Sequence, residues 1–142
     1  AVSYSIKTPI SQKKKVISSR DAYEVFRGNW NMDLIQLQEE FKIILLNRAN
    51  LVLGIYSLSK GGSTSTIVDC KLIFSVALKC AANSIVLGHN HPSTNLFPSI
   101  QDITLTKKII AGAKLLDIKV IDHIILTSEN YYSFADEGKL DY

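Results

Sequence analysis

The feature that most constrains this chain is a pair of histidines placed directly after a short apolar segment. Residues 84–88 read Ser-Ile-Val-Leu-Gly, a run that is typical of a central strand covered on both faces. His89 and His91 follow at once, and in an extended backbone residues i and i+2 point to the same side. Pro92 biases His91 toward that extended conformation. The sequence therefore predicts a buried strand that ends in two convergent imidazoles.

Apolar periodicity outlines the rest of the fold. The expected elements are a helix over 20–37 with Ser19 as its N-cap, a hairpin of strands 41–46 and 51–58 around the turn 47–50, a helix over 69–82, a helix over 99–116, a strand over 119–127 and a short terminal element over 131–140. Apolar strands mixed with helices predict an α/β fold, a three-layer α/β/α sandwich. Residues 1–19 are expected to form an N-terminal arm or edge strand.

Composition excludes several classes of protein. No stretch approaches the roughly 18 consecutive apolar residues of a membrane-spanning helix. The two cysteines, Cys70 and Cys80, are too few for a disulfide framework and lack the CxxC spacing of structural zinc sites. No secretory signal opens the chain, so a reduced, cytoplasmic protein is expected.

The net charge is +3, but five of the 16 basic residues lie in the first twenty. We expect the run Lys13–Lys15 to be a solvated tail or edge strand rather than a DNA-binding arm.

A carboxylate completes a candidate metal site. Asp102 stands eleven residues after His91 and is expected in the first turn of the helix that follows the histidine loop. Two neutral imidazoles and one carboxylate, with a fourth position open, are the ligand set of a catalytic zinc site; manganese and iron are the alternatives. Ser99 and Asp102 also fit a simpler role as an N-cap and a first-turn acid. The full string from His89 to Asp102 favours a metal site, because few purely structural roles would require all of its characteristic residues together.

This string resembles the JAMM metalloprotease signature. The wider order of motifs is similar to the JAB domain of the RadC family: the turn Leu45-Leu46-Asn47-Arg48, the glycines Gly61-Gly62, the histidine string, Asp122-His123 and the closing Tyr131–Gly138. The resemblance covers about residues 20–142 and implies a JAB/MPN domain, a cytidine-deaminase-like sandwich around a mixed sheet. The zinc deaminases themselves are excluded, because their His-x-Glu and Pro-Cys-x-x-Cys motifs are missing.

The resemblance also assigns roles to individual residues. His89, His91 and Asp102 would be the zinc ligands, with water in the fourth position. Ser99 would hydrogen-bond the oxyanion that develops on a substrate carbonyl. The implied reaction is zinc-dependent hydrolysis of an amide or isopeptide bond in a protein or peptide substrate.

The family's general base is a glutamate that precedes an aromatic residue at the start of a strand. Glu39 and Glu40 are the candidates here, because both stand just ahead of Phe41. Glu39 is preferred, since a residue two positions before Phe41 shares its strand face. The third histidine, His123, lies in an apolar strand and is expected to be buried and hydrogen-bonded in the core or beside the ligands rather than to bind metal itself.

The family's DNA-repair label adds a second hypothesis. RadC proteins typically carry an N-terminal helix-hairpin-helix segment, and residues 1–38 show no such signature, so no nucleic-acid-binding residues are predicted. The alternative to a hydrolase is a metal-bearing interaction module without turnover, acting in DNA repair or in conjugative or anti-restriction processing of mobile elements. A carboxylate beside an open metal position would favour the hydrolase, and a fourth protein ligand would favour the module.

Overall fold

The fold is built on one five-stranded sheet. The computed structural model describes residues 14–60 and 68–140. Its elements are α1 (Ser19–Gly28), β1 (Glu40–Leu46), β2 (Val52–Lys60), α2 (Cys70–Lys79), β3 (Ser84–Asn90), α3 (Ile100–Leu115), β4 (Lys119–Leu126) and β5 (Tyr131–Ser133). The predicted Gly61-Gly62 turn, and Lys13 of the basic run, lie outside the described residues.

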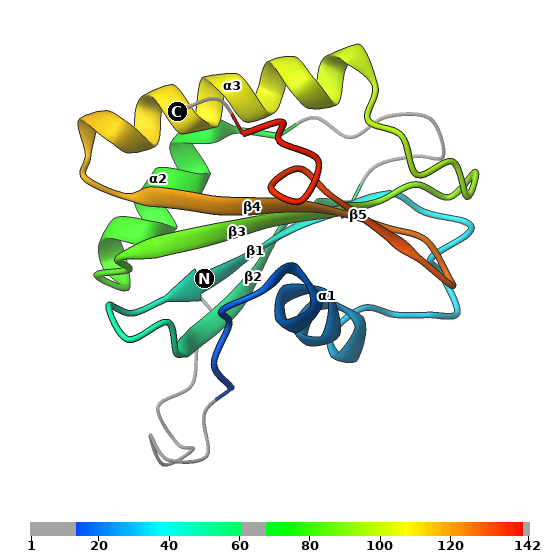
Figure 1. Cartoon of the computed structure of the whole chain (residues 1–142), viewed down its shortest axis with the longest axis horizontal. Helices are drawn as coiled ribbons and strands as arrows, with labels where there is room; N and C mark the ends of the chain where they lie inside the picture. The colour runs from blue at the N-terminus through cyan, green and yellow to red at the C-terminus, as the bar shows by residue number, and fades with distance from the viewer. Residues whose placement is uncertain (1–13, 61–67, 141–142) are drawn as a thin grey trace.

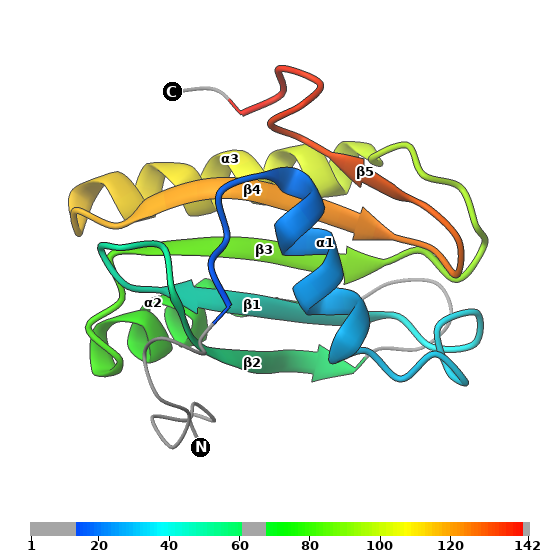
Figure 2. The same ribbon diagram turned by 60° about the horizontal axis from the view of Figure 1, so that its bottom comes forward.

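The sheet is mixed, with the strand order β2-β1-β3-β4-β5. β3 and β4 run parallel, and every other neighbouring pair is antiparallel. Figures 1 and 2 show α2 and α3 on one face of the sheet and α1 on the other. This arrangement confirms the predicted α/β/α sandwich and agrees with a JAB/MPN fold. None of the helices in the described part of the chain is long and apolar enough to span a bilayer.

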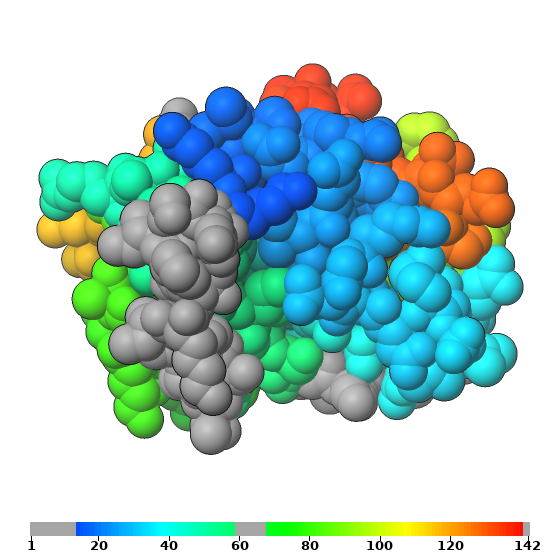
Figure 3. Space-filling model, turned by 90° about the horizontal axis from the view of Figure 1, so that it is seen from below, coloured from blue at the N-terminus to red at the C-terminus, as the bar shows by residue number. Residues whose placement is uncertain are grey.

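Two apolar cores hold the layers together, and β3 contributes to both. Ile85 and Leu87 pack toward α2 and α3, whereas Val86 packs toward α1. All seven residues of β3 are buried. Figure 3 views the α1 side, where the blue helix and the light-blue residues after it lie across the face. The strand that carries the histidines is therefore fixed from both sides, as the apolar run predicted.

Gly88 allows α1 to pack directly onto β3, next to His89. A Cβ atom built at Gly88 would lie 2.5 Å from the Cζ atom of Phe26, which is closer than real Cβ contacts. The Phe26 ring is fully buried and fills the space that a side chain would occupy. A glycine at this position thus sets the close approach of the helix to the strand.

The prediction for the first helix was wrong at both ends. Its N-cap is Ser18, not Ser19, because the Ser18 hydroxyl accepts the backbone N–H of Asp21 at 3.1 Å. The helix ends at Gly28 rather than continuing to 37. The side chain of Asn29 donates to the carbonyl of Val25 at 2.8 Å, which satisfies one of the last helical acceptors. Apolar residues beyond Gly28 kept a helix-like spacing, but they belong to a turn-rich segment.

The segment before α1 is partly described. Lys15 pairs with Leu51 in an isolated antiparallel bridge. The Lys14 ammonium lies 3.4 Å from the exposed carboxylate of Glu24. An exposed ion pair of this kind contributes little to stability.

Candidate metal centre

Three chain segments meet at one end of the sheet to form the candidate metal centre. These are the start of β1, the end of β3 and the N-terminus of α3, which lie together at the right of Figure 1. Phe41 of β1 pairs with His89 of β3 in the sheet register. Their rings stack with centroids 5.8 Å apart, so both side chains lie on the face covered by α2 and α3.

Three side chains converge at this point. The Nε2 atoms of His89 and His91 are 2.9 Å apart. Oδ1 of Asp102 lies 3.1 Å from Nε2 of His89, and its Oδ2 lies 3.1 Å from Nε2 of His91. The structure thus brings together the three side chains for which the sequence predicted a ligand role. His89 is buried, and the other two are mostly covered.

Asp102 is held in place by the start of α3. Ser99 is the N-cap, and its hydroxyl accepts the backbone N–H of Asp102 at 3.1 Å. Oδ2 of Asp102 accepts the backbone N–H of Ser99 at 2.8 Å in return, which completes a capping box. The simpler helix-cap explanation of this pair is therefore correct, and the same cap aims Asp102 at the histidines. The hydrogen of the Ser99 hydroxyl is not used in these two bonds.

The ring orientation of His91 is fixed by a backbone carbonyl. Its Nδ1 lies 2.6 Å from the carbonyl oxygen of Asn95. Because a carbonyl oxygen can only accept, Nδ1 carries a hydrogen and the neutral ring has its lone pair on Nε2. That lone pair points toward His89 and Asp102.

The orientation of His89 is fixed by a longer chain of bonds. The Thr106 hydroxyl donates to the carbonyl of Asp102 at 2.7 Å, so it must accept from Nδ1 of His123, which lies 2.6 Å away. Nε2 of His123 then has a lone pair and accepts from Nδ1 of His89 at 2.8 Å. Nε2 of His89 is therefore also a lone-pair atom. As predicted, His123 is fully buried and hydrogen-bonded beside the ligands.

Without a metal ion, protons on the ring nitrogens must separate these lone pairs, and the pKa shifts of the acid and the rings are those of that protonated, metal-free cluster. Burial alone would raise the pKa of the Asp102 carboxyl, but hydrogen bonds to His89 and His91 outweigh it and hold that pKa well below its ordinary 3.8. Burial lowers the pKa of His91, yet its bonds to Asp102 and Asn95 raise it above 6.5 overall. Burial, and then the charge of His89, lower the pKa of His123 well below its ordinary value, so this imidazole is neutral at pH 7.

Glu39, the residue just before β1, lies beside the histidines. One carboxylate oxygen of Glu39 and one nitrogen each of His89 and His91 lie within 4.8 Å of one another. Glu40 is directed elsewhere: it is buried, and its Oε2 lies 3.8 Å from Nζ of Lys42. Of the two candidate acids, the structure brings Glu39 to the histidines.

Asn90, which stands between the two histidines, fixes the segment that carries Glu39. It is completely buried, and its side-chain amide donates to the carbonyls of Ile35 and Gln38 at 2.8 and 2.9 Å. Its Oδ1 accepts the backbone N–H of Glu40 at 2.8 Å. Sequence reasoning missed this residue. The alternation of side chains along the strand could have pointed to Asn90, because the middle residue of His-x-His must face the opposite side of the sheet from both imidazoles.

The donor set fits a zinc ion. With both rings neutral, Nε2 of His89, Nε2 of His91 and the Asp102 carboxylate are three acceptors in contact, with no hydrogen between them. Such a cluster needs a cation or added protons. Zinc–nitrogen and zinc–oxygen bonds of about 2.0–2.2 Å place tetrahedral ligand atoms about 3.4 Å apart, close to the separations seen here. Glu39 offers a second carboxylate, but Asp102 lies nearer to both rings.

Comparisons with known proteins agree with the fold. A family model described as the RadC-like JAB domain matches residues 16–139. The UPF0758 protein of Flavobacterium johnsoniae is 43% identical over 130 residues, which make up 91% of this chain and 55% of that protein. The UPF0758 protein of Porphyromonas gingivalis is 38% identical over 130 residues, or 91% of this chain and 56% of that protein. A relative in Staphylococcus haemolyticus, also a UPF0758 protein, is 34% identical over 131 residues, or 92% and 56%.

The chain spans little more than half the length of these curated relatives, and their names state no activity. The family match nevertheless covers every residue of the metal centre, from Glu39 through Asp102. The match and the identities together show that the chain belongs to the RadC family and contains its JAB domain.

Proposed function

We propose that this protein is a zinc-dependent hydrolase of amide or isopeptide bonds. The observation that carries the proposal is the convergence of two imidazole nitrogens and one carboxylate. The Nε2 atoms of His89 and His91 lie 2.9 Å apart, and each lies 3.1 Å from one oxygen of Asp102. The opposite nitrogen of each ring is held as a donor by Asn95 or His123. Rings held in this way present the metal-binding nitrogen without further rearrangement.

In this proposal His89, His91 and Asp102 hold the zinc. Bound zinc supplies a Lewis acid that polarises a carbonyl and lowers the pKa of water toward about 7. Glu39 stays outside the ligand set and accepts a proton from the attacking water. It then passes that proton to the leaving nitrogen.

Ser99 supplies the remaining group. Its hydroxyl oxygen accepts from Asp102, and its hydrogen donates to the oxyanion that forms on the substrate carbonyl. A scaffold that only held a metal would still need Ser99 as the N-cap that positions Asp102, but it would not need a carboxylate at Glu39 beside the histidines. Glu39 therefore supports the hydrolase over the non-enzymatic module. The substrate would be a protein or peptide in the cytoplasm, a reducing compartment in which Cys70 and Cys80 stay free thiols.

The proposal is tested with the purified wild-type chain. We expect about one zinc per chain by elemental mass spectrometry. Zinc-loaded protein, incubated with denatured proteome and with lysine-linked isopeptides, should generate new termini that mass spectrometry identifies. A chelator should stop the reaction and added zinc should restore it. A zinc-loaded protein that cleaves neither substrate pool would contradict the hydrolase and leave the interaction module.

Loss of the His123 imidazole should weaken metal binding without removing a ligand. His123→Phe keeps an aromatic ring beside Phe134, whose ring stacks on His123 at 4.6 Å, but it removes the acceptor for Nδ1–H of His89. Loss of such an outer partner typically lowers metal affinity about 10–100-fold. Competition with a zinc-binding dye measures the change, and a Phe134→Leu variant controls for altered packing. Unchanged affinity in His123→Phe would show that the bond to His89 does not support the site.

A further inference from the structure

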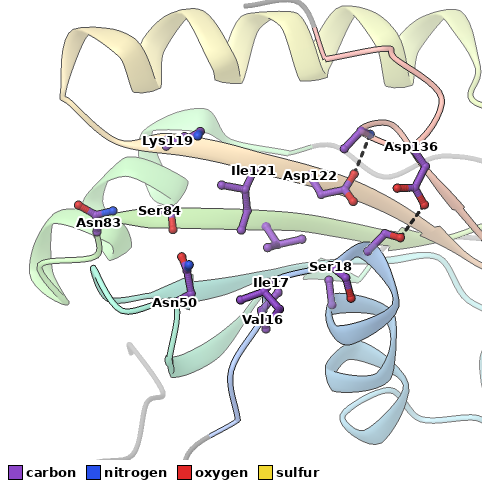
Figure 4. A pocket seen from close by; sticks show the side chains of 14 residues that line it. Val16, Ile17, Ser18, Asn50, Asn83, Ser84, Lys119, Ile121, Asp122 and Asp136 are labelled. Atoms are coloured by element: carbon purple, nitrogen blue, oxygen red, sulfur yellow. Dashed lines mark hydrogen bonds between the residues drawn. The ribbon is translucent and has the colours of Figure 1, made fainter.

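A cavity lies on the α1 face of the sheet, near the starts of β3 and β4 rather than at the metal centre. Its volume is about 470 Å³, within the range of small-molecule sites. The walls come from the segment before α1, the turn between β1 and β2, the first residues of β3 and β4, and the turn after β5 (Figure 4). None of the metal-site residues lines it.

A buried hydroxyl without a hydrogen-bond partner lines this cavity. Ser84 is 1% exposed, and its Oγ makes no hydrogen bond within the described part of the chain. In Figure 4 the Ser84 hydroxyl points from β3 toward the side chain of Asn50, which rises from the opposite wall. A buried polar atom that remains unpaired costs about 1–3 kcal/mol. The hydroxyl is therefore suited to a partner that enters the cavity.

The surroundings of Ser84 are rich in donors and carry one positive charge. Asn50, Asn83 and the exposed residue Lys119 line the same cavity, and their side chains end in two amides and an ammonium. No carboxylate of the described residues lies within ion-pair distance of Lys119. The charge and the donors at this end match an anion with several acceptor oxygens.

The acids of the cavity lie at its other end and are already engaged. Asp122 accepts from the Ser133 hydroxyl at 2.7 Å and from the backbone N–H of Ala135 at 3.0 Å. Asp136 accepts from the Ser19 hydroxyl. Figure 4 shows both carboxylates on the opposite side from Lys119 and Asn83. They therefore do not neutralise the cationic end.

Between these two ends Val16 and Ile121 add apolar surface to the wall (Figure 4), and Val86 also lines the cavity. We propose that it binds a small molecule whose carboxylate or phosphate group meets Ser84, Asn50, Asn83 and Lys119, and whose apolar body lies along those three side chains. This site is independent of the metal centre. It would let the domain respond to, or carry, an anionic small molecule while the other end of the sheet acts on a substrate.

Residue-resolved NMR titration of the whole chain tests the proposal with three probes: inorganic phosphate, 4-methylpentanoate and the neutral 4-methylpentanamide. We expect saturable shifts at Ser84, Asn83 and Lys119 with an anion, and none at His89 and His91. Tighter binding of 4-methylpentanoate would identify a carboxylate ligand, and tighter binding of phosphate would identify a phosphate ligand. The proposal would be overturned if neither anion saturates the shifts up to about 10 mM, or if the amide binds as tightly as 4-methylpentanoate.

Matched variants separate the anion contacts from folding. Ser84→Ala and Lys119→Gln should each weaken anion binding about tenfold or more, the effect of losing a hydrogen bond to a charged group. Lys108→Gln, an exposed change on α3 across the sheet, should leave binding unchanged. Ser84→Ala should not lower the unfolding temperature, because it removes an unpaired hydroxyl. A marked loss of stability in that variant would show that the hydroxyl already has a partner, and would overturn the site.

Discussion

Glu39→Gln should reduce the rate of hydrolysis about 10²–10⁴-fold, the usual contribution of a general base, while zinc stays bound. Glutamine keeps the shape and hydrogen-bonding reach of glutamate but cannot take a proton from water. One carboxylate oxygen of Glu39 lies within 4.8 Å of one nitrogen of each histidine, close enough to reach a water between them. The measurement is turnover per zinc-loaded chain, with zinc determined in the same sample.

Glu40→Gln is the matched control, because it makes the same change one residue further along. The Glu40 carboxylate is buried and lies 3.8 Å from Nζ of Lys42, away from the metal centre. This variant should keep its turnover and lose some stability, since a buried ion pair loses one partner. Loss of zinc from Glu39→Gln would instead make Glu39 a ligand. Equal turnover in wild type and Glu39→Gln would remove it from the mechanism.

The alternation of side chains along a strand predicted how the central residues of this site are oriented. The i and i+2 rule predicted that the side chains of His89 and His91 would converge, and the same rule separated Glu39 from Glu40. Both predictions depend only on the alternation of side chains along a strand, which any extended segment must obey. The apolar run before His89 likewise predicted a strand covered on both faces, and β3 is buried along its whole length.

Contacts between distant segments could not be read in the same way. His123 meets Thr106 and His89 only because β4 lies beside β3 beneath α3, a relation that the fold sets. The partner of His91 is the backbone carbonyl of Asn95, an atom that every residue type possesses. No pattern of side chains in the sequence can therefore predict the contact between His91 and this carbonyl.

The prediction of where α1 ends was wrong for a local reason. Trp30 and Ile35 are both buried apolar residues after Gly28, and they extend an apolar spacing that a helix would also show. Gly28 and Asn29 are a helix-stop signal that outweighs this periodicity. Near a helix end, the stop signal is thus better evidence than the apolar pattern.

Asp102→Asn should abolish stoichiometric zinc binding and lower zinc affinity by more than about 100-fold, beyond what loss of an outer partner costs. The change removes the charge that neutralises the cation, and it puts an amide in place of an anionic ligand. Asparagine can still accept the backbone N–H of Ser99, so the start of α3 should persist. Elemental analysis after dialysis, with circular dichroism for helix content, measures the two effects separately.

Ser99→Ala provides the opposite change to Asp102→Asn and completes the test. It removes the N-cap hydroxyl, which costs about 1 kcal/mol of stability, but it leaves every proposed ligand in place. We therefore expect Ser99→Ala to unfold at a lower temperature and to retain zinc, whereas Asp102→Asn loses zinc.

Since hydrogen bonds hold the pKa of Asp102 below 3.8, its carboxylate also stabilises the metal-free fold above that pH. The stability difference between metal-free wild type and Asp102→Asn should then shrink as the pH falls below 3.8. Full zinc retention by Asp102→Asn would show that the carboxylate acts only as a helix cap, and the hydrolase proposal would lose its third ligand.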